Sequence, residues 1–431
     1  MTVLNSADQV PAAPLSSVRR VLVATTCAFL LVAPFSGSAG WRAASLLLAA
    51  AALAFDRGES VRRLREAPRS FVIAWIAWAM LAIASVAWSE RPAYSATELR
   101  AELMYGTLAL GVFFVAASST AWLRTWWCVL MAGSALAFAA PLLEHLLGTR
   151  FSRHDLDGGP GPWSTHLVLI APLFVALAWT GPWSAQRRPL ALAAAIGLLV
   201  FSAWATANRI VWVALAAELG TVALLHGALA PSRVNRGSMV VLVSLAAVLV
   251  AVALPASIIE RSERYFPGRS GVTQLQHDAR PLLWAAAWDK FREAPLLGHG
   301  FGREILESTF RAHTPPDQPE PTLQHAHNTF IDIALETGLA GVAIFVALLL
   351  ALARVHLRLL RDPALAPLGI IGLSVIAGFV VKNLTDDFFH RHNALLFWAI
   401  QAALAGYGLR ALGRRGESGD WISKPRRVTR P

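Results

Sequence analysis

The chain has 431 residues, of which 55% are hydrophobic and 15% charged, and its mean hydropathy is +0.50. This composition excludes a soluble multidomain protein and indicates a protein that crosses a membrane several times. The formal net charge of +11 does not indicate a nucleic-acid-binding face, because most arginines fall in short loops between apolar runs, as membrane topology requires. Both cysteines, Cys27 and Cys128, lie inside apolar runs, which excludes a disulfide framework and a thiolate metal cluster.

Apolar runs follow one another along most of the chain. After a polar tail of residues 1–18, we expect twelve helical spans over residues 21–35, 41–55, 70–88, 101–117, 121–147, 165–180, 189–207, 210–229, 237–258, 329–353, 366–381 and 394–412. The predicted fold class is all-α: a polytopic membrane protein with about twelve transmembrane helices and one large polar segment with amphipathic helices outside the membrane. The predicted regions are residues 1–256 (helices 1–9), 257–326 (the polar segment), 327–413 (helices 10–12) and 414–431 (the tail).

The distribution of basic residues predicts the orientation. With a cytoplasmic N-terminus, cytoplasmic segments carry 22 of the 38 Lys and Arg residues, against 8 in the short outer segments. The long polar segment carries the rest, and long segments do not count in the positive-inside rule. Both termini are therefore predicted to be cytoplasmic. The polar segment, Asn208-Arg209, His327 and residues 382–393 are predicted to lie together on the outer face.

The polar segment contains one stretch with helical periodicity. From Arg280, the aromatic residues Trp284, Trp288 and Phe291 follow at helical spacing, and Pro281 suits a first turn. We expect an amphipathic helix at the membrane surface. The glycines of residues 298–302 lack the strand-to-helix context of a nucleotide site and indicate a turn.

The polar segment re-enters the membrane through residues 324–341. His327 is placed at the water–membrane boundary, and Asn328 is predicted to cap the N-terminus of the apolar helix of residues 329–353. Gly338 and Gly341 are three residues apart, so we expect them to share a face that the backbone of another helix can approach closely.

Three polar residues on the predicted outer face are candidates for chemistry: Arg209, Arg280 and His327. Arg209 lies at the mouth of a span, where it needs a partner, and a structural salt bridge is the alternative. Arg280 begins a helix, where a cation is unfavourable unless an anion also binds; an ordinary surface arginine is the alternative. His327 could instead cap its helix, or form an H-x-H metal site with His325, although no third ligand lies at a suitable spacing.

The stretch His327-Asn328, nine residues, then Gly338-x-x-Gly341 resembles the signature of the O-antigen ligases and their polymerase relatives. The layout is similar too: about twelve spans, one large segment before the motif helix, Asn208-Arg209 at a span mouth, and the runs of residues 280–284 and 295–300. The resemblance implies a membrane fold similar to the GT-C glycosyltransferases and a periplasmic position for the polar segment. It places the family's essential histidine on His327 and its arginines on Arg209 and Arg280.

The resemblance also implies an activity, in the bacterial inner membrane with the active site facing the periplasm. A glycan on undecaprenyl diphosphate moves to a sugar hydroxyl of lipid A-core, with inversion and without a metal or other cofactor, in lipopolysaccharide biosynthesis. His327 would act as the base, and Arg209 and Arg280 would bind the donor diphosphate. Supporting roles are assigned to Asn328, His325, Asp332, Asp387 and Arg391. Donor, acceptor and membrane lipids are the expected partners.

Other functions remain open at this stage. An O-antigen polymerase would use the same donor chemistry, although many polymerases have two large periplasmic loops and this chain has one. A protein O-oligosaccharyltransferase usually continues into an additional C-terminal region, which is not seen after Trp421. A membrane transporter would place charges along a route at mid-span, whereas here they gather at one face.

Overall fold

The computed structural model describes residues 17–146, 159–180, 184, 187–206, 208–229, 244–245, 247–256, 258–259, 280–313, 324–387 and 389–417. These residues are helical or irregular and contain no strand, so the predicted all-α class is confirmed. The α-helices are α1 (Ser17–Val32), α2 (Ala39–Phe55), α3 (Arg57–Leu64), α4 (Arg69–Ser85), α5 (Pro92–Glu98), α6 (Tyr105–Ala116), α7 (Thr120–Leu146), α8 (Pro160–Thr180), α9 (Arg188–Thr206), α10 (Ile210–Leu229), α14 (Arg280–Glu293), α15 (Glu307–His313), α16 (Thr329–Leu359), α17 (Ala366–Lys382) and α18 (Arg391–Glu417). Short 3₁₀ turns η1 (Ser36–Ser38) and η2 (Val86–Trp88) and π-helical stretches η3 (Leu99–Met104) and η5 (Leu249–Ala253) complete this part of the chain.

Seven helical stretches of the described residues are long and apolar enough to cross a membrane: Ser36–Phe55, Arg69–Trp88, Pro92–Ala116, Pro160–Ala178, Ile210–Leu229, Thr329–Leu359 and Arg391–Arg415. Two shorter apolar helices cover Leu190–Thr206 and Ala366–Lys382. The chain is thus a polytopic integral membrane protein. The count of twelve spans and the predicted regions stay predictions. The expected span of residues 237–258 lies partly outside the described residues, and so does the polar segment, at residues 260–279 and 314–323.

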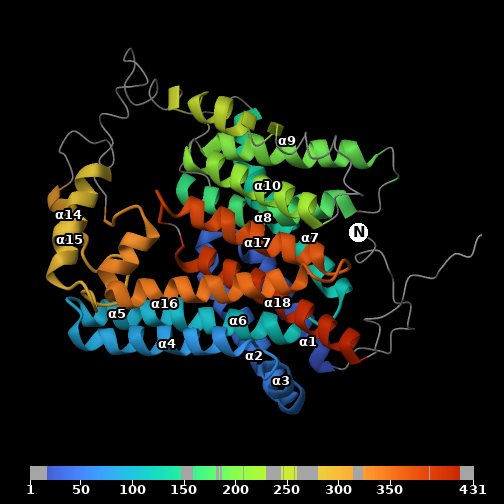
Figure 1. Cartoon of the computed structure of the whole chain (residues 1–431), viewed down its shortest axis with the longest axis horizontal. Helices are drawn as coiled ribbons and strands as arrows, with labels where there is room; N and C mark the ends of the chain where they lie inside the picture. Colours follow the sequence, from blue (N-terminus) through green and yellow to red (C-terminus); the bar gives the residue numbers. More distant parts are fainter. Residues whose placement is uncertain are drawn as a thin grey trace, which may run out of the picture.

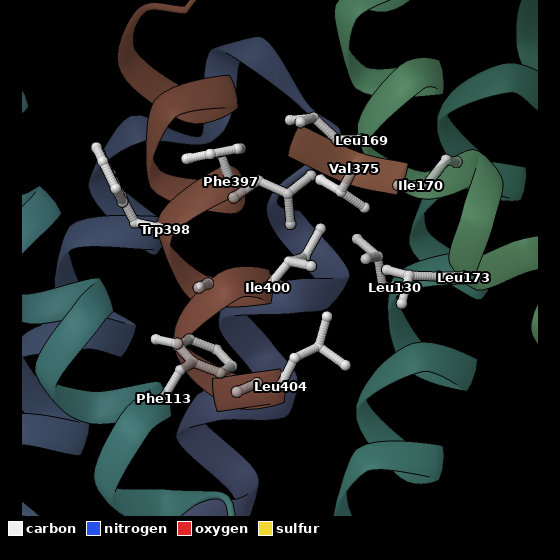
Figure 2. Packing of buried hydrophobic residues seen from close by; sticks show 14 of the residues in the cluster. Phe113, Leu130, Leu169, Ile170, Leu173, Val375, Phe397, Trp398, Ile400 and Leu404 are labelled. Carbon is white, nitrogen blue, oxygen red and sulfur yellow. The ribbon is translucent and has the colours of Figure 1, made fainter. Parts of the chain in front are cut away.

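The long helices lie side by side, and α18 runs through the interior of the bundle (Figure 1). The apolar part of α18 is 83% buried, whereas that of α4 is 11% buried, so α4 lies at the periphery. Small residues let α18 pack closely: Gly406 lies against the Phe114 carbonyl of α6. Figure 2 shows Phe397, Ile400 and Leu404 of α18 among apolar side chains of α6, α7, α8 and α17.

Helix α16 is not continuous, because Gly338 breaks it with φ 68° and ψ −167°. A break leaves helical N–H and C=O groups without partners. The loop of residues 294–300 satisfies them through four backbone hydrogen bonds: Leu339 N to Pro295 O (2.9 Å), Ala340 N to Leu296 O (3.2 Å), His299 N to Leu335 O (2.8 Å) and Gly300 N to Glu336 O (2.9 Å). The loop therefore completes the helix.

The two motif glycines have different surroundings. A Cβ on Gly338 would overlap the Leu296 backbone, so the predicted close approach is confirmed, although a loop rather than a helix makes it. A Cβ on Gly341 would instead meet the Thr337 side chain of the same helix. The expectation that both glycines serve one neighbouring helix is therefore wrong, because the chain bends between Thr337 and Leu339.

Helices α14 and α15 lie together at one end of the bundle (Figure 1). The predicted helix from Arg280 is confirmed as α14, but its three aromatic residues do not form one buried face. Trp284 donates its indole N–H to the Ala326 carbonyl at 2.8 Å, whereas Trp288 is 58% exposed. Leu283 and Ala287 form the buried side of the helix instead. The reason is that α14 packs against other parts of the protein, and not only against the membrane surface.

Candidate active site

His327 occupies a strained position at the start of α16. Its φ is 52°, in the left-handed region that costs energy for residues other than glycine. Asn328 follows as the N-cap, and its side-chain oxygen accepts from the N–H groups of Phe330 (2.9 Å) and Ile331 (3.2 Å). The predicted cap is confirmed. It fixes the direction in which the chain enters the helix, directly after His327.

Neighbours on both sides anchor this turn. Ala326 donates its N–H to Asp332 Oδ1 at 2.9 Å, and its carbonyl accepts from Trp284. The Asn328 side-chain amide donates to the Leu384 carbonyl at 2.7 Å. Asp332 therefore holds the backbone of Ala326, the residue before His327. The strain at His327 is maintained because the residues around it are held by α14, α16 and the loop after α17.

The His327 side chain is half-buried and has charged groups around it. Its ring centroid is 4.3 Å from that of His325, and its Nδ1 has no hydrogen-bond partner among the described residues. Burial lowers the pKa of His327; Arg280 and Arg303 lower it further, and Asp386 opposes them. A histidine with a lowered pKa is neutral at neutral pH, so it can accept a proton.

The structure brings the predicted arginine positions to the same place. Arg280, the first residue of α14, acts electrostatically on both His327 and Lys382. The side-chain oxygen of Asn208 accepts from the N–H of Ile210, the first residue of α10, at 3.2 Å. Its side-chain amide donates to Asp386 Oδ2 at 2.7 Å. Arg209, next to Asn208, is therefore attached to the loop that borders His327. Segments around residues 209, 280 and 327 thus converge from three distant parts of the sequence.

His325 belongs to a second set of buried groups. Its Nε2 lies against an Arg303 NH₂ group, and Arg303 Nε pairs with Asp387 Oδ2 at 2.5 Å. A guanidinium can only donate, so Nε2 of a neutral His325 accepts from Arg303. The backbone N–H of His327 lies 3.2 Å from His325 Nδ1. Nδ1 lies 3.4 Å from Asp387 Oδ2 and 3.9 Å from Asp332 Oδ2. Burial and then Arg303 hold the pKa of His325 well below its usual value, so His325 acts as a neutral link between charged groups.

This second set bears on the metal alternative raised by the H-x-H pattern. One ligand atom each from His325, Asp332 and Asp387 lie within 4.8 Å of one another, although the spacing analysis found no third ligand. Asp387 was expected as a supporting residue, but its proximity to Asp332 was not. The cation of this set is Arg303, whose guanidinium contacts both His325 and Asp387. We therefore assign the set to the protein's own charges.

A small pocket of about 70 Å³ adjoins this set on the side of α4 and η3. Its polar lining includes Glu98 and Glu102, which the sequence analysis did not single out, together with His390. His390 Nε2 lies 3.1 Å from Glu98 Oε2 and 3.4 Å from Glu102 Oε1. Arg391 has a left-handed backbone, donates its N–H to Glu102 at 2.6 Å and is 60% exposed at the side chain. Arg391 thus lies at the carboxylates of Glu98 and Glu102, where α5 passes into η3.

One charged residue departs from the expected gathering at one face. Glu218 lies within α10, is 3% exposed, and packs against Gly378 of α17. Its Oε1 has no hydrogen-bond partner in the described part of the chain. An intramembrane acid is costly unless it is protonated or used. The sequence alone does not single out Glu218, because one glutamate in a strongly apolar run hardly changes the hydropathy of the span.

Comparison with known proteins finds one family match. Residues 194–346 match a protein family described as O-antigen ligase. The matched region includes Arg209, Arg280, His327 and the two motif glycines, whereas Asp387 and Arg391 follow it. A search of curated proteins found no match. The match covers about a third of the chain. Together with the helical membrane architecture, it agrees with the resemblance drawn from the motif and supports membership of the O-antigen ligase superfamily.

Proposed function

We propose that this protein is an O-antigen ligase: it moves a glycan from undecaprenyl diphosphate to a sugar hydroxyl of lipid A-core. The superfamily acts in glycan transfer related to lipopolysaccharide, and its members use a lipid-linked donor and a lipid acceptor. The observation that carries the proposal is the position of His327, which is strained, half-buried and flanked by Arg280 and the Asn208-Arg209 segment inside the family region. A base and two cations are what this transfer needs.

In this mechanism His327 takes the proton of the acceptor hydroxyl. The freed electron pair of the oxygen forms a bond to the anomeric carbon, and the bond from that carbon to the diphosphate oxygen breaks. The electron pair of the broken bond leaves with undecaprenyl diphosphate. A direct displacement of this kind inverts the anomeric centre. Burial and the nearby arginines keep His327 neutral before the reaction, and general-base catalysis contributes on the order of 10² to 10⁴ in rate.

Arg209 and Arg280 would bind the donor diphosphate, whose negative charge grows as it leaves. A guanidinium offers a planar pair of donors that matches phosphate oxygens, and each charged hydrogen bond contributes about 1.5 to 3 kcal/mol. Arg280 already lies within electrostatic range of His327. The arginines supply the neutralising charge in this mechanism, so it requires no metal.

The test is a transfer assay with purified protein in lipid vesicles. Undecaprenyl-diphosphate-linked glycan and lipopolysaccharide that ends at the core are supplied together, and products are separated on gels. Ligation gives core molecules that carry the glycan, whereas a polymerase gives longer chains on undecaprenyl diphosphate without core. Activity should persist in EDTA. Products without core would replace the ligase assignment with the polymerase, and loss in EDTA with recovery by zinc would replace the metal-free mechanism.

The proposed location is the bacterial inner membrane, with cytoplasmic termini and an active site that faces the periplasm. Cysteine labelling in intact cells tests this orientation. Cysteines at Arg62 and Arg358 should resist an impermeant thiol reagent, whereas one at the exposed Trp288 should react. The reversed pattern would place His327 on the cytoplasmic side and remove the proposed reaction.

A further inference from the structure

A single buried carboxylate, Asp386, connects the elements that meet at His327. It lies in the loop after α17, and its side chain is 3% exposed. Its Oδ2 accepts a hydrogen bond from Asn208 Nδ2 at 2.7 Å and pairs with Lys382 Nζ. Its backbone carbonyl accepts from the Thr329 N–H at 3.3 Å. The residue is therefore bonded to the segment before α10, to the end of α17 and to the start of α16.

These hydrogen bonds hold residues that are close in sequence to two proposed site residues. Asn208 immediately precedes Arg209, and Thr329 is the second residue after His327. Asp386 lies beyond the region that matches the O-antigen ligase family. Its role therefore has to be argued from contacts rather than from the match.

We propose that Asp386 is a positioning residue for glycan transfer: it holds Asn208, and so Arg209, beside His327, and its charge stabilises the imidazolium that forms there. This inference rests on the proposed function, in which the proton of the acceptor hydroxyl moves to His327. A positive imidazolium in a buried site is costly without a nearby anion.

The charges that face His327 come from several elements. Arg280 of α14 and Arg303 of the turn before α15 oppose protonation of the imidazole, while Asp386 and Asp387 favour it, with Asp386 the stronger of the two. The neighbouring His325 ring is neutral, and Lys382 reaches this network as the partner of Asp386. Burial alone would raise the pKa of Asp386, but Lys382 and then His327 and Asn208 hold it below its usual value. Asp386 is therefore an anion at neutral pH.

A purely structural role would be different: Asp386 would serve only to neutralise the buried Lys382. Breaking a buried ion pair by removing one partner is strongly destabilising, whereas replacing both partners with neutral residues is often harmless. The two roles therefore predict opposite behaviour for a double variant. Asn at position 386 is useful here, because its oxygen can still accept from Asn208 while the charge is lost.

The experiment measures the pH dependence of kcat/KM in vesicles for wild type, Asp386→Asn, Asp386→Glu, Lys382→Met and the Lys382→Met/Asp386→Asn double variant. For Asp386→Asn we expect a fall on the order of tenfold to hundredfold, below the full loss of a general base. The rising limb of its plot of kcat/KM against pH should move to lower pH, because a negative charge that favours the imidazolium has been removed. Asp386→Glu should keep the wild-type limb, and the double variant should not recover activity.

A matched control is Asp362→Asn. Asp362 is also a buried carboxylate, with a side chain that is 8% exposed. It forms an ion pair with Arg415 (2.7 Å) and lies beyond the far end of α16 from His327. We expect wild-type kcat/KM and an unchanged limb. The amount of folded protein from gel filtration accompanies each measurement.

Recovery of activity by the double variant with a wild-type limb would overturn the inference in favour of simple neutralisation of Lys382. If the double variant does not fold, Asp386→Asn and Asp386→Glu decide the matter: equal limb positions in the two would also overturn the inference. Failure of the proposed function is a separate result, because then wild type itself would transfer no glycan to core.

Discussion

A half-buried histidine lies just before the N-cap of helix α16 and a fully buried one lies near its end, and the two differ in informative ways. His356 is fully buried in regular helix, its Nε2 lies 2.6 Å from Gln401 Oε1, and its ring packs against Gly372. His327 lies in a left-handed turn among Arg280, Arg303 and Asp386. In both residues Nδ1 has no hydrogen-bond partner among the described residues.

An unpartnered nitrogen is therefore not what separates a structural histidine from a candidate base. The difference lies in the backbone and in the charges. His356 is held by packing and by its hydrogen bond with Gln401, whereas the strain at His327 persists because the surrounding elements fix it. Charges around His327 can also respond to a proton or to a bound phosphate.

The largest expected effect breaks this comparison directly. His327→Ala should lower glycan transfer on the order of 10² to 10⁴, with normal accumulation of the protein, because the lost imidazole is the base. His356→Ala should keep kcat and instead lower the thermal stability, because it opens a cavity in the core. Transfer assays and thermal unfolding of both variants in detergent check this pair. Full activity in His327→Ala would remove the proposed base.

The next effect concerns the arginines near His327, which have no counterpart around His356 among the described residues. Arg280→Ala and Arg209→Ala should each lower turnover on the order of 10² to 10³, as expected for removal of a transition-state donor. Lys at either position keeps the charge but loses the paired donors, so activity should still fall strongly. The double Ala variant should cost less than the sum, because both residues would bind one diphosphate.

Binding of undecaprenyl diphosphate separates the arginines from the base. Both arginine variants should bind it more weakly, and His327→Ala should bind it almost as wild type does. Unchanged affinity in the arginine variants would exclude the diphosphate role.

The pH dependence of the wild type provides a third test. His327 must be neutral to act, and its pKa is lowered by burial and the nearby arginines. The rate should therefore be flat near neutral pH and fall about tenfold per pH unit only below a pKa that lies under the usual value of about 6.5. A limb above pH 7 that His327 variants with residual activity retain would assign the titration to another group.

Much of this site could be predicted from local sequence patterns. The cap at Asn328, the helix from Arg280 and the glycine turn near residue 300 depend on neighbours within a few residues, and all three are confirmed. Hydropathy likewise predicted the all-helical membrane class. These features are local, so short windows of sequence contain them.

What could not be predicted depends on distant pairs. Asn208 and Asp386 are 178 positions apart, and no spacing rule brings them together. Arg303 lay in a polar stretch with no periodicity, so nothing distinguished it from other arginines of that segment. The break at Gly338 was hidden for a related reason: the apolar pattern continues through it, and the loop that completes the helix lies about 40 residues earlier.

That break gives a fourth prediction, which concerns stability at the turn between the two histidines. Gly338→Ala should destabilise the protein by about 1 to 3 kcal/mol or more, because the left-handed conformation is strained and a Cβ would overlap the Leu296 backbone. Gly197→Ala in α9 is the control, since its Cβ would meet no atom within 4 Å. Thermal unfolding in detergent measures both. Equal stability of the two variants would contradict the contact between α16 and the loop.

The smallest expected effect separates two tasks of Asn328. Its oxygen caps α16, and its amide donates to the Leu384 carbonyl in the loop that carries Asp386. Asn328→Ala removes both and should cost about 0.5 to 2 kcal/mol. Asn328→Asp keeps an oxygen for the cap, where a negative charge suits the helix N-terminus, but it cannot donate to Leu384. We therefore expect Asp to recover the stability of the helix while transfer stays below wild type, since the loop loses one of its bonds beside His327. Unfolding temperature and kcat, measured on the same preparations, decide the question: full recovery of both by Asp would mean that the cap alone positions the histidine.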